Sequence, residues 1–150
     1  MEPLAIWLTR FSRLNALALE GRSAGRGSTS AEDAVLGALR LGGPVLSPTE
    51  LTRAVIQSPG GLTKTLRRLE VSGLIRRRPD PADRRSLLVV LTPKGRRAAE
   101  RALADTEEYF AEVLVELSDR ERAELATLVR VILDRLEPVA GMARSSVIPD

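Results

Sequence analysis

Three cations lie on one side of a short segment in the middle of the chain. In residues 59–72, Lys64, Arg67 and Arg68 recur at the spacing of helical turns, and Glu70 is the only acidic residue. An ordinary solvated helix face mixes both charge signs, because opposite charges one turn apart stabilise a helix. A cationic face suits phosphates, and an arginine fork matches the two acceptors of a guanine edge. The segment therefore predicts nucleic-acid binding.

The positive charge continues through the surrounding chain. Residues 53–97 hold 12 Lys or Arg against 3 acids, a charge of +9, whereas the remainder carries −6. Arg84 and Arg85 end a turn-forming segment, and from a hairpin tip they could reach a narrow minor groove. Asp83 beside them either makes ordinary turn contacts or orients Arg85. This asymmetry predicts a polyanionic partner for the middle of the chain.

Other kinds of chemistry lack the residues that they need. The chain has no cysteine and no histidine, which excludes disulfides, thiolate metal sites and imidazole acid–base catalysis. Glu108, Glu112 and Glu116 share one helix stripe, but such a stripe is typical of a solvated face. We expect no metal, no cofactor and no enzymatic activity. Without a run of roughly 20 apolar residues, we also expect a cytoplasmic protein rather than a membrane one.

Local signals make the cationic segment the second of two short helices. Ser47 and Glu50 form a capping box around Pro48, which predicts one helix just before it. Ser58 can cap the second helix, and Gly73 suits its end. Two short helices joined by a tight turn are a helix-turn-helix, whose second helix enters the major groove.

The second helix is amphipathic, with Leu62, Leu66 and Leu69 on its apolar side. At its N-terminus, two glycines leave backbone N–H groups open to a phosphate, where the helix dipole is positive. Together with the hairpin tip, these features give a set of predicted DNA-contacting residues: Ser58, Gly60, Gly61, Lys64, Arg67, Arg68, Asp83, Arg84 and Arg85.

After this helix the apolar pattern changes. Residues 74–78 and 86–91 are rich in branched side chains, and the Pro- and Asp-containing segment between them predicts a two-stranded hairpin with a basic tip. The arginines at 76–78 would either protect a strand edge from aggregation or contact the DNA backbone.

Longer amphipathic helices are predicted on both sides of this module. The first covers residues 4–19, and a mobile connection over residues 21–30 leads to a helix that Ser30 begins. A helix over residues 93–117 and a last one from the Ser118 capping box end the chain. The apolar faces at both ends exceed what a central module of about 60 residues can cover, which predicts a homodimer.

Residues 46–95 resemble the MarR family of bacterial transcription regulators. The resemblance is carried by LEVSGLIR at 69–76, DPADRRS at 80–86 and LTPKG at 91–95. It implies a mainly α fold with a small β-hairpin wing, that is, a winged helix-turn-helix with flanking dimerisation helices. The implied single domain 1–150 divides into a DNA-binding lobe over 30–92, dimerisation helices over 1–20 and 93–138, and a tail over 139–150.

The resemblance also implies a function. Members of the MarR family are dimers that bind a pseudo-palindromic operator in double-stranded DNA. They usually act as repressors that a small ligand releases. For an apolar or aromatic ligand, the implied pocket lies between the dimerisation helices and the DNA-binding lobe. Its candidates, for which a core or dimer contact is the alternative, are Trp7, Arg10, Phe11, Leu36, Leu39, Tyr109 and Phe110. A winged helix that binds protein or RNA instead remains the second hypothesis.

Overall fold

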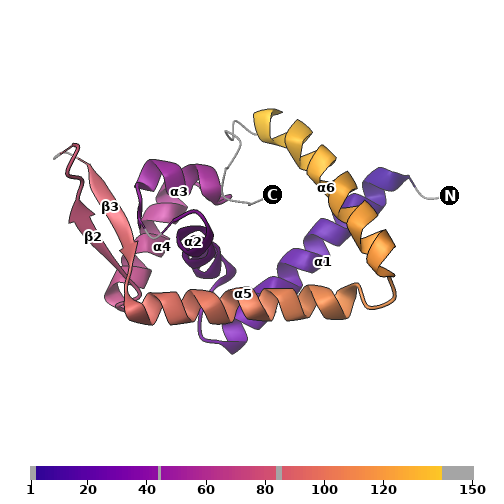
Figure 1. The fold of residues 1–150 in the computed structure, drawn as a ribbon, viewed down its shortest axis with the longest axis horizontal. Helices are drawn as coiled ribbons and strands as arrows, with labels where there is room; N and C mark the ends of the chain where they lie inside the picture. The colour runs from indigo at the N-terminus through magenta and orange to yellow at the C-terminus, as the bar shows by residue number, and fades with distance from the viewer. Residues whose placement is uncertain (1–2, 44, 84–85, 140–150) are drawn as a thin grey trace.

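The structure, a computed structural model, describes residues 3–43, 45–83 and 86–139 (Figure 1). These residues form a mainly helical fold with a small antiparallel sheet, as predicted. The elements in chain order are α1 (Leu4–Gly25), α2 (Ser30–Leu41), β1 (Val45–Leu46), α3 (Pro48–Ala54), α4 (Pro59–Val71), β2 (Ile75–Pro79), β3 (Leu87–Leu91), α5 (Pro93–Val113) and α6 (Asp119–Val139).

Helix α2 lies at the centre of the core, between α3, α4 and α5 (Figure 1). Val35, Leu36 and Leu39 on α2 are fully buried, and the apolar side of α4 packs in the same cluster through Leu62, Leu66 and Leu69. The burial of the three leucines of α4 confirms the predicted inward side of that helix. Its opposite side is therefore turned to solvent.

The predicted hairpin is confirmed as β2 and β3, which pair antiparallel from Ile75↔Leu91 to Pro79↔Leu87. A third strand, β1, pairs with the other edge of β3, which gives the order β1-β3-β2. The sequence did not predict β1 because it is two residues long, too short for an alternating pattern to show. The strand fixes the base of the wing against the rest of the lobe.

Most predicted helix starts are confirmed at the atomic level. The Ser47 and Glu50 side chains form the expected capping box, and those of Ser118 and Glu121 form another. The predicted cap of α2 is wrong by one residue: Thr29 Oγ1 accepts from the Glu32 backbone N–H, and the Glu32 carboxylate accepts from that of Thr29. Here Glu32, which stands three residues after Thr29, completes the box.

The predicted mobile connection over residues 21–30 is wrong for its first half, because α1 continues to Gly25. Tertiary contacts hold this end of α1 despite its glycines. Ser23 is buried, and the backbone N–H of Ser30 donates to Glu20 Oε2 at 3.1 Å. At the other end of the fold, α5 ends at Val113, four residues earlier than predicted.

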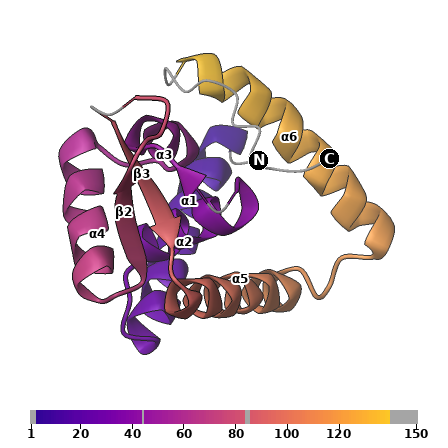
Figure 2. The ribbon, with the colours of Figure 1, turned by 60° about the vertical axis from the view of Figure 1, so that its left-hand side comes forward.

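Helices α1 and α6 flank the core and leave large apolar side chains exposed. Figure 2 shows α6 standing away from α2, α4 and the sheet. None of the described helices is apolar over a stretch long enough to cross a membrane. The exposed apolar residues of the two helices are Leu4, Ile6, Trp7, Leu8, Phe11, Leu14, Leu17, Leu125, Leu128, Val129, Val131, Ile132, Leu133 and Leu136.

Candidate nucleic-acid interface

Helix α4 lies on the edge of the molecule, next to β2 (Figure 2). Its outer side carries exposed cations. Gly60, Lys64 and Arg67 are exposed along it, while Thr65 on the inner side is buried. A single helix presented in this way is narrow enough to enter a major groove. We refer to Gly60, Lys64 and Arg67 as the outer face of α4.

The N-terminus of α4 is fixed by a cap and a glutamine. Ser58 Oγ accepts from the backbone N–H of Gly61 at 3.1 Å, which confirms the predicted cap. Gln57 joins two helices, because its Nε2 donates to Ala31 O of α2 at 3.0 Å and its Oε1 accepts from Thr65 Oγ1 at 3.0 Å. These bonds hold the second turn of α4 against α2, and so orient its outer face.

Arg68 lies beside Lys64, as the helical spacing predicts, and its side chain is 53% exposed. Its surroundings also include Glu32 at the start of α2, which the sequence did not connect with it. The Nε atom of Arg68 lies 3.1 Å from Oε1 of Glu32, within an ion pair. The prediction overlooked Glu32 because that residue lies 36 positions earlier in the chain and meets Arg68 only through the packing of α2 on α4.

The wing carries further cations. Arg76 and Arg78 are exposed on β2, whereas Arg77 is half-buried with its Nε 3.4 Å from Oε2 of Glu70. Strand protection and DNA contact remain open for Arg76 and Arg78, while Arg77 joins β2 to α4. The predicted site residues Arg84 and Arg85 lie outside the described residues.

Asp83 stands at the described edge of the wing turn. Its carbonyl accepts from the backbone N–H of Ser86 at 2.9 Å, and Asp80 Oδ1 accepts from that of Ala82 at 2.8 Å. The Asp80 bond is the side-chain turn contact expected of aspartate, whereas the Asp83 bond is made by the backbone. The proposed orientation of Arg85 by the Asp83 carboxylate stays a prediction.

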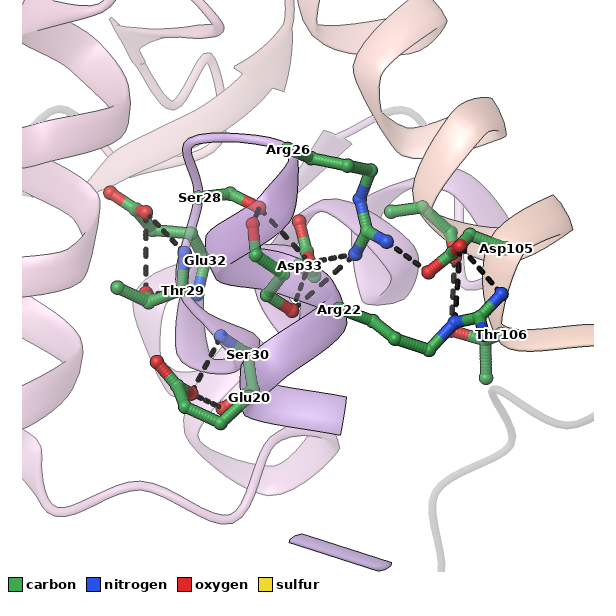
Figure 3. A network of polar contacts seen from close by, with 12 residues as sticks. Glu20, Arg22, Arg26, Ser28, Thr29, Ser30, Glu32, Asp33, Asp105 and Thr106 are labelled. Atoms are coloured by element: carbon green, nitrogen blue, oxygen red, sulfur yellow. Dashed lines mark hydrogen bonds and ion pairs between the residues drawn. The ribbon is translucent and has the colours of Figure 1, made fainter. Parts of the chain in front are cut away.

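A charged network attaches this lobe to the flanking helices (Figure 3). Arg22 at the end of α1 donates from Nε to Asp105 Oδ1 of α5 at 3.1 Å. Arg26 pairs with Asp105 as well, and its Nη2 lies 2.6 Å from Oδ2 of Asp33 on α2. Ser23 also donates to Asp33, at 2.6 Å. Arg22 and Arg26 thus link α1 to α2 and α5. The glycine-rich sequence around them gave no indication of this role.

Asp105 makes this network sensitive to acid. The hydrogen bond from Arg22, aided by the charge of Arg26, lowers the pKa of Asp105 below its ordinary 3.8. A lowered pKa in the folded state stabilises the fold above the unfolded-state pKa, and this stabilisation is lost as the pH falls through the folded-state value. The contribution is therefore complete at neutral pH and fades below about pH 5.

We expect Asp105→Asn to reduce the dependence of the free energy of unfolding on pH in the acid range. Urea unfolding measured from pH 7 to pH 3 should show the variant less stable than the wild type at neutral pH and converging with it at low pH. Glu107→Gln, an exposed acid on the same helix, is the control and should follow the wild type. Parallel profiles for wild type and Asp105→Asn, without convergence, would contradict the assignment.

The predicted ligand residues do not come together within the described chain. Leu36 and Leu39 belong to the core, and Trp7, Arg10 and Phe11 are exposed on α1. Tyr109 packs edge to face on Phe110, with Arg22 5.7 Å above the tyrosine ring. A groove of roughly 700 Å³ does lie between the end of α1, α2 and α5, with none of these residues among its lining. Its lining includes Asn15, Leu19, Ala34, Ala38 and Leu103.

Comparison with known proteins agrees with this geometry. The sequence model of the MarR family matches residues 29–86. The chain is 34% identical over 106 residues to the multiple antibiotic resistance protein MarR of Salmonella typhimurium, covering 70% of the chain and 73% of that protein. It is 33% identical over 99 residues to the HTH-type transcriptional regulator PecS of Dickeya dadantii. That match covers 65% of the chain and little more than half, 57%, of PecS.

Solved structures match over nearly their whole length. A mutant MarR from E. coli in complex with operator DNA superposes with a TM-score of 0.76 at 27% identity, covering 87% of this chain and 94% of that one. BpsR of Bordetella bronchiseptica, whose DNA binding is regulated by 6-hydroxynicotinic acid, gives a TM-score of 0.78 at 27% identity over 89% of this chain and 94% of that one. The likeness extends beyond the helix-turn-helix to the flanking helices.

Proposed function

Since the chain belongs to the MarR family of transcriptional regulators, we propose that it is a homodimeric repressor that binds a pseudo-palindromic operator in double-stranded DNA. The exposed outer face of α4, cationic and bordered by the arginines of β2, carries this proposal. In two copies, such faces can meet successive major grooves roughly 34 Å apart. Binding through two linked modules raises affinity well above that of one.

We propose separate roles for the central lobe and the flanking helices. Residues 30–92 form the DNA-binding lobe, and the helices within 1–20 and 93–138 form the dimer. The exposed apolar faces of α1 and α6 support this role, because soluble monomers rarely leave so much apolar surface in contact with water. An operator with two half-sites needs such a two-fold partner.

We also propose that a small apolar or aromatic ligand relieves repression. The groove between α1, α2 and α5 is a candidate place for it, because it adjoins the network that attaches the lobe to the flanking helices. A ligand there would change DNA binding only to the extent that it binds one arrangement of lobe and flanks better than the other. The regulation of BpsR by 6-hydroxynicotinic acid offers a precedent of this kind.

Selection of bound fragments from the host genome tests the function. We expect one or a few enriched sequences with two-fold symmetry, bound at least about 1,000-fold more tightly than a scrambled duplex. Affinity should fall steeply as salt rises, because released counterions contribute to binding. Equal affinity for operator and scrambled DNA would contradict sequence-specific repression.

The dimer can be tested on α6. Leu128→Glu combined with Ile132→Glu places two charges on its exposed apolar face. We expect these charges to weaken the association of two subunits about 100-fold or more. Light scattering at micromolar concentration should then report a monomer. Ile56→Glu changes an apolar side chain that is 89% exposed in the DNA-binding lobe, and this control should remain a dimer. A dimeric double variant would place the interface elsewhere.

A further inference from the structure

Glu32 is an acidic residue buried within the cationic lobe. Its side chain is only 9% exposed, although it stands at the start of α2 where water is close. A buried carboxylate is destabilising unless hydrogen bonds satisfy its oxygens. The contacts that it makes therefore indicate what it is for.

The two carboxylate oxygens of Glu32 serve different elements. Oε2 accepts from the backbone N–H of Thr29 at 2.9 Å and from Thr29 Oγ1 at 3.2 Å, which closes the capping box of α2. Oε1 lies 3.1 Å from Nε of Arg68, one turn before the end of α4, and forms an ion pair with it. The cap fixes the carboxylate, and the carboxylate in turn fixes the arginine.

The contact with Glu32 leaves other N–H donors of the Arg68 guanidinium unused. The Arg68 side chain is 53% exposed, and among the described residues it forms an ion pair with Glu32 through Nε. The two terminal nitrogens of the guanidinium remain for another acceptor. Arg68 lines the same shallow recess as Ser58, Gly61 and Lys64, at the flank of the outer face of α4.

We propose that Glu32 is a positioning residue for DNA binding, which holds Arg68 through Nε so that its terminal nitrogens clasp a backbone phosphate beside the groove. This inference rests on the proposed DNA-binding function. Arg68 would then fix the register of α4 on the duplex, while the outer face reads bases. A guanidinium that is already oriented loses less side-chain entropy on binding than a free one.

Charge alone makes the opposite prediction. A carboxylate close to a DNA surface repels phosphates, so its removal should tighten binding to every duplex. If Glu32 positions Arg68, its removal should instead weaken operator binding. The sign of the change therefore separates positioning from simple electrostatics.

Glu32→Gln is the variant that makes this separation. Glutamine can still close a capping box through its carbonyl oxygen, but its amide group presents a donor to Arg68 in place of an acceptor. We expect operator affinity, measured by fluorescence anisotropy, to fall about tenfold, because Arg68 loses its charged partner. Affinity for a scrambled duplex should stay equal or rise, so the specificity ratio falls.

Two further variants complete the test. Glu32→Gln combined with Arg68→Ala should bind the operator no more weakly than Arg68→Ala alone, because the two residues act as one unit. Arg68→Lys keeps the charge but has no Nε and no fork, so it should lose operator affinity much as Glu32→Gln does. This second variant leaves Glu32 in place and tests the proposal even if Glu32→Gln fails to fold.

Glu50→Gln is the matched control. Glu50 closes the capping box of α3 in the same lobe, and among the described residues no arginine forms an ion pair with it. It should leave operator affinity unchanged or slightly raised. Operator binding by Glu32→Gln as tight as that of the wild type, or additive losses in the double variant, would overturn the inference. A wild type without operator preference would overturn the proposed function itself.

Discussion

Substitution of Gly95 by alanine should destabilise the fold by about 3 kcal/mol or more, the upper range for an overpacked site. Gly95 lies in the first turn of α5, where a Cβ atom would stand 1.8 Å from the carbonyl oxygen of Leu74 and 2.8 Å from its carbon. Both atoms belong to the backbone, so no side-chain rotation relieves the clash. Either α5 or the turn between α4 and β2 must move.

The surrounding hydrogen bonds prevent an easy movement. Thr92 N donates to Leu74 O at 3.0 Å, and Thr92 Oγ1 donates to Gly73 O at 2.7 Å while accepting from Gly95 N. Lys94 Nζ adds a bond to Ser72 O at 2.9 Å. A shift large enough to accommodate a methyl group would break several of these bonds. It would also separate α4 and β2 from α5.

Urea unfolding of the wild type and Gly95→Ala measures this effect. Gly21→Ala is the control, because an added Cβ there has no neighbour within 4 Å and the residue lies inside α1. That control should gain about 0.5 to 1 kcal/mol, as expected for alanine in an exposed helix. A Gly95→Ala variant as stable as the wild type would show that the two backbones do not approach so closely in solution.

The structural features that could be predicted well from the sequence are local ones. The capping boxes at Ser47 and Ser118 involve residues three apart, and the glycine at position 73 adopts the positive φ of 68° that a helix end favours. The hairpin follows from two apolar runs with turn residues between them. These features depend on neighbours in the chain, so one sequence suffices to find them.

The features that the sequence missed depend on tertiary contacts. The end of α1 looks like a flexible linker, yet Asp105, some 80 residues away, pairs with Arg22 and Arg26 and keeps it in place. Local composition cannot show a partner at that distance. The same reason explains why α1 extends past its predicted end.

Arg68 shows a second limit of the same kind. At about 100° per residue, Arg67 and Arg68 lie on either side of Lys64, so the helical spacing places all three on one side of α4. The sequence offered no reason to separate the three, because charge sign alone does not tell a DNA contact from an ion pair. Only the packing of α2 beside α4 brings Glu32 to Arg68 and gives the arginine a different environment.

The second large effect is expected at the outer face of α4. Lys64→Ala combined with Arg67→Ala should weaken operator binding at least about 100-fold, because each contact to phosphate or base contributes roughly 1 to 3 kcal/mol. In the proposed dimer both substitutions occur twice, which increases the expected loss. The fold should be unaffected, since both side chains are exposed and the buried leucines of α4 are unchanged.

The same variant separates base reading from charge attraction. A lost phosphate contact weakens binding to every duplex and lowers the salt slope by about one per contact, whereas a lost base contact relaxes the sequence preference. Titrations of operator and scrambled duplex at several salt concentrations therefore assign each residue when the single variants are compared. Arg85→Ala, at a position outside the described residues, is expected to lose a similar roughly 1 to 3 kcal/mol of operator binding.

Arg120→Ala combined with Arg122→Ala matches the loss of charge at a distant site. Both arginines lie on α6, where Arg120 pairs with Glu124 and Arg122 lies 4.0 Å from Asp119. If the protein attracted DNA only through its net charge, this control and the α4 variant would weaken binding equally. We expect the control to retain operator affinity within about threefold, because exposed charges more than a Debye length from the duplex are largely screened. Equal losses of affinity in the two variants would contradict the proposal that α4 binds in the major groove.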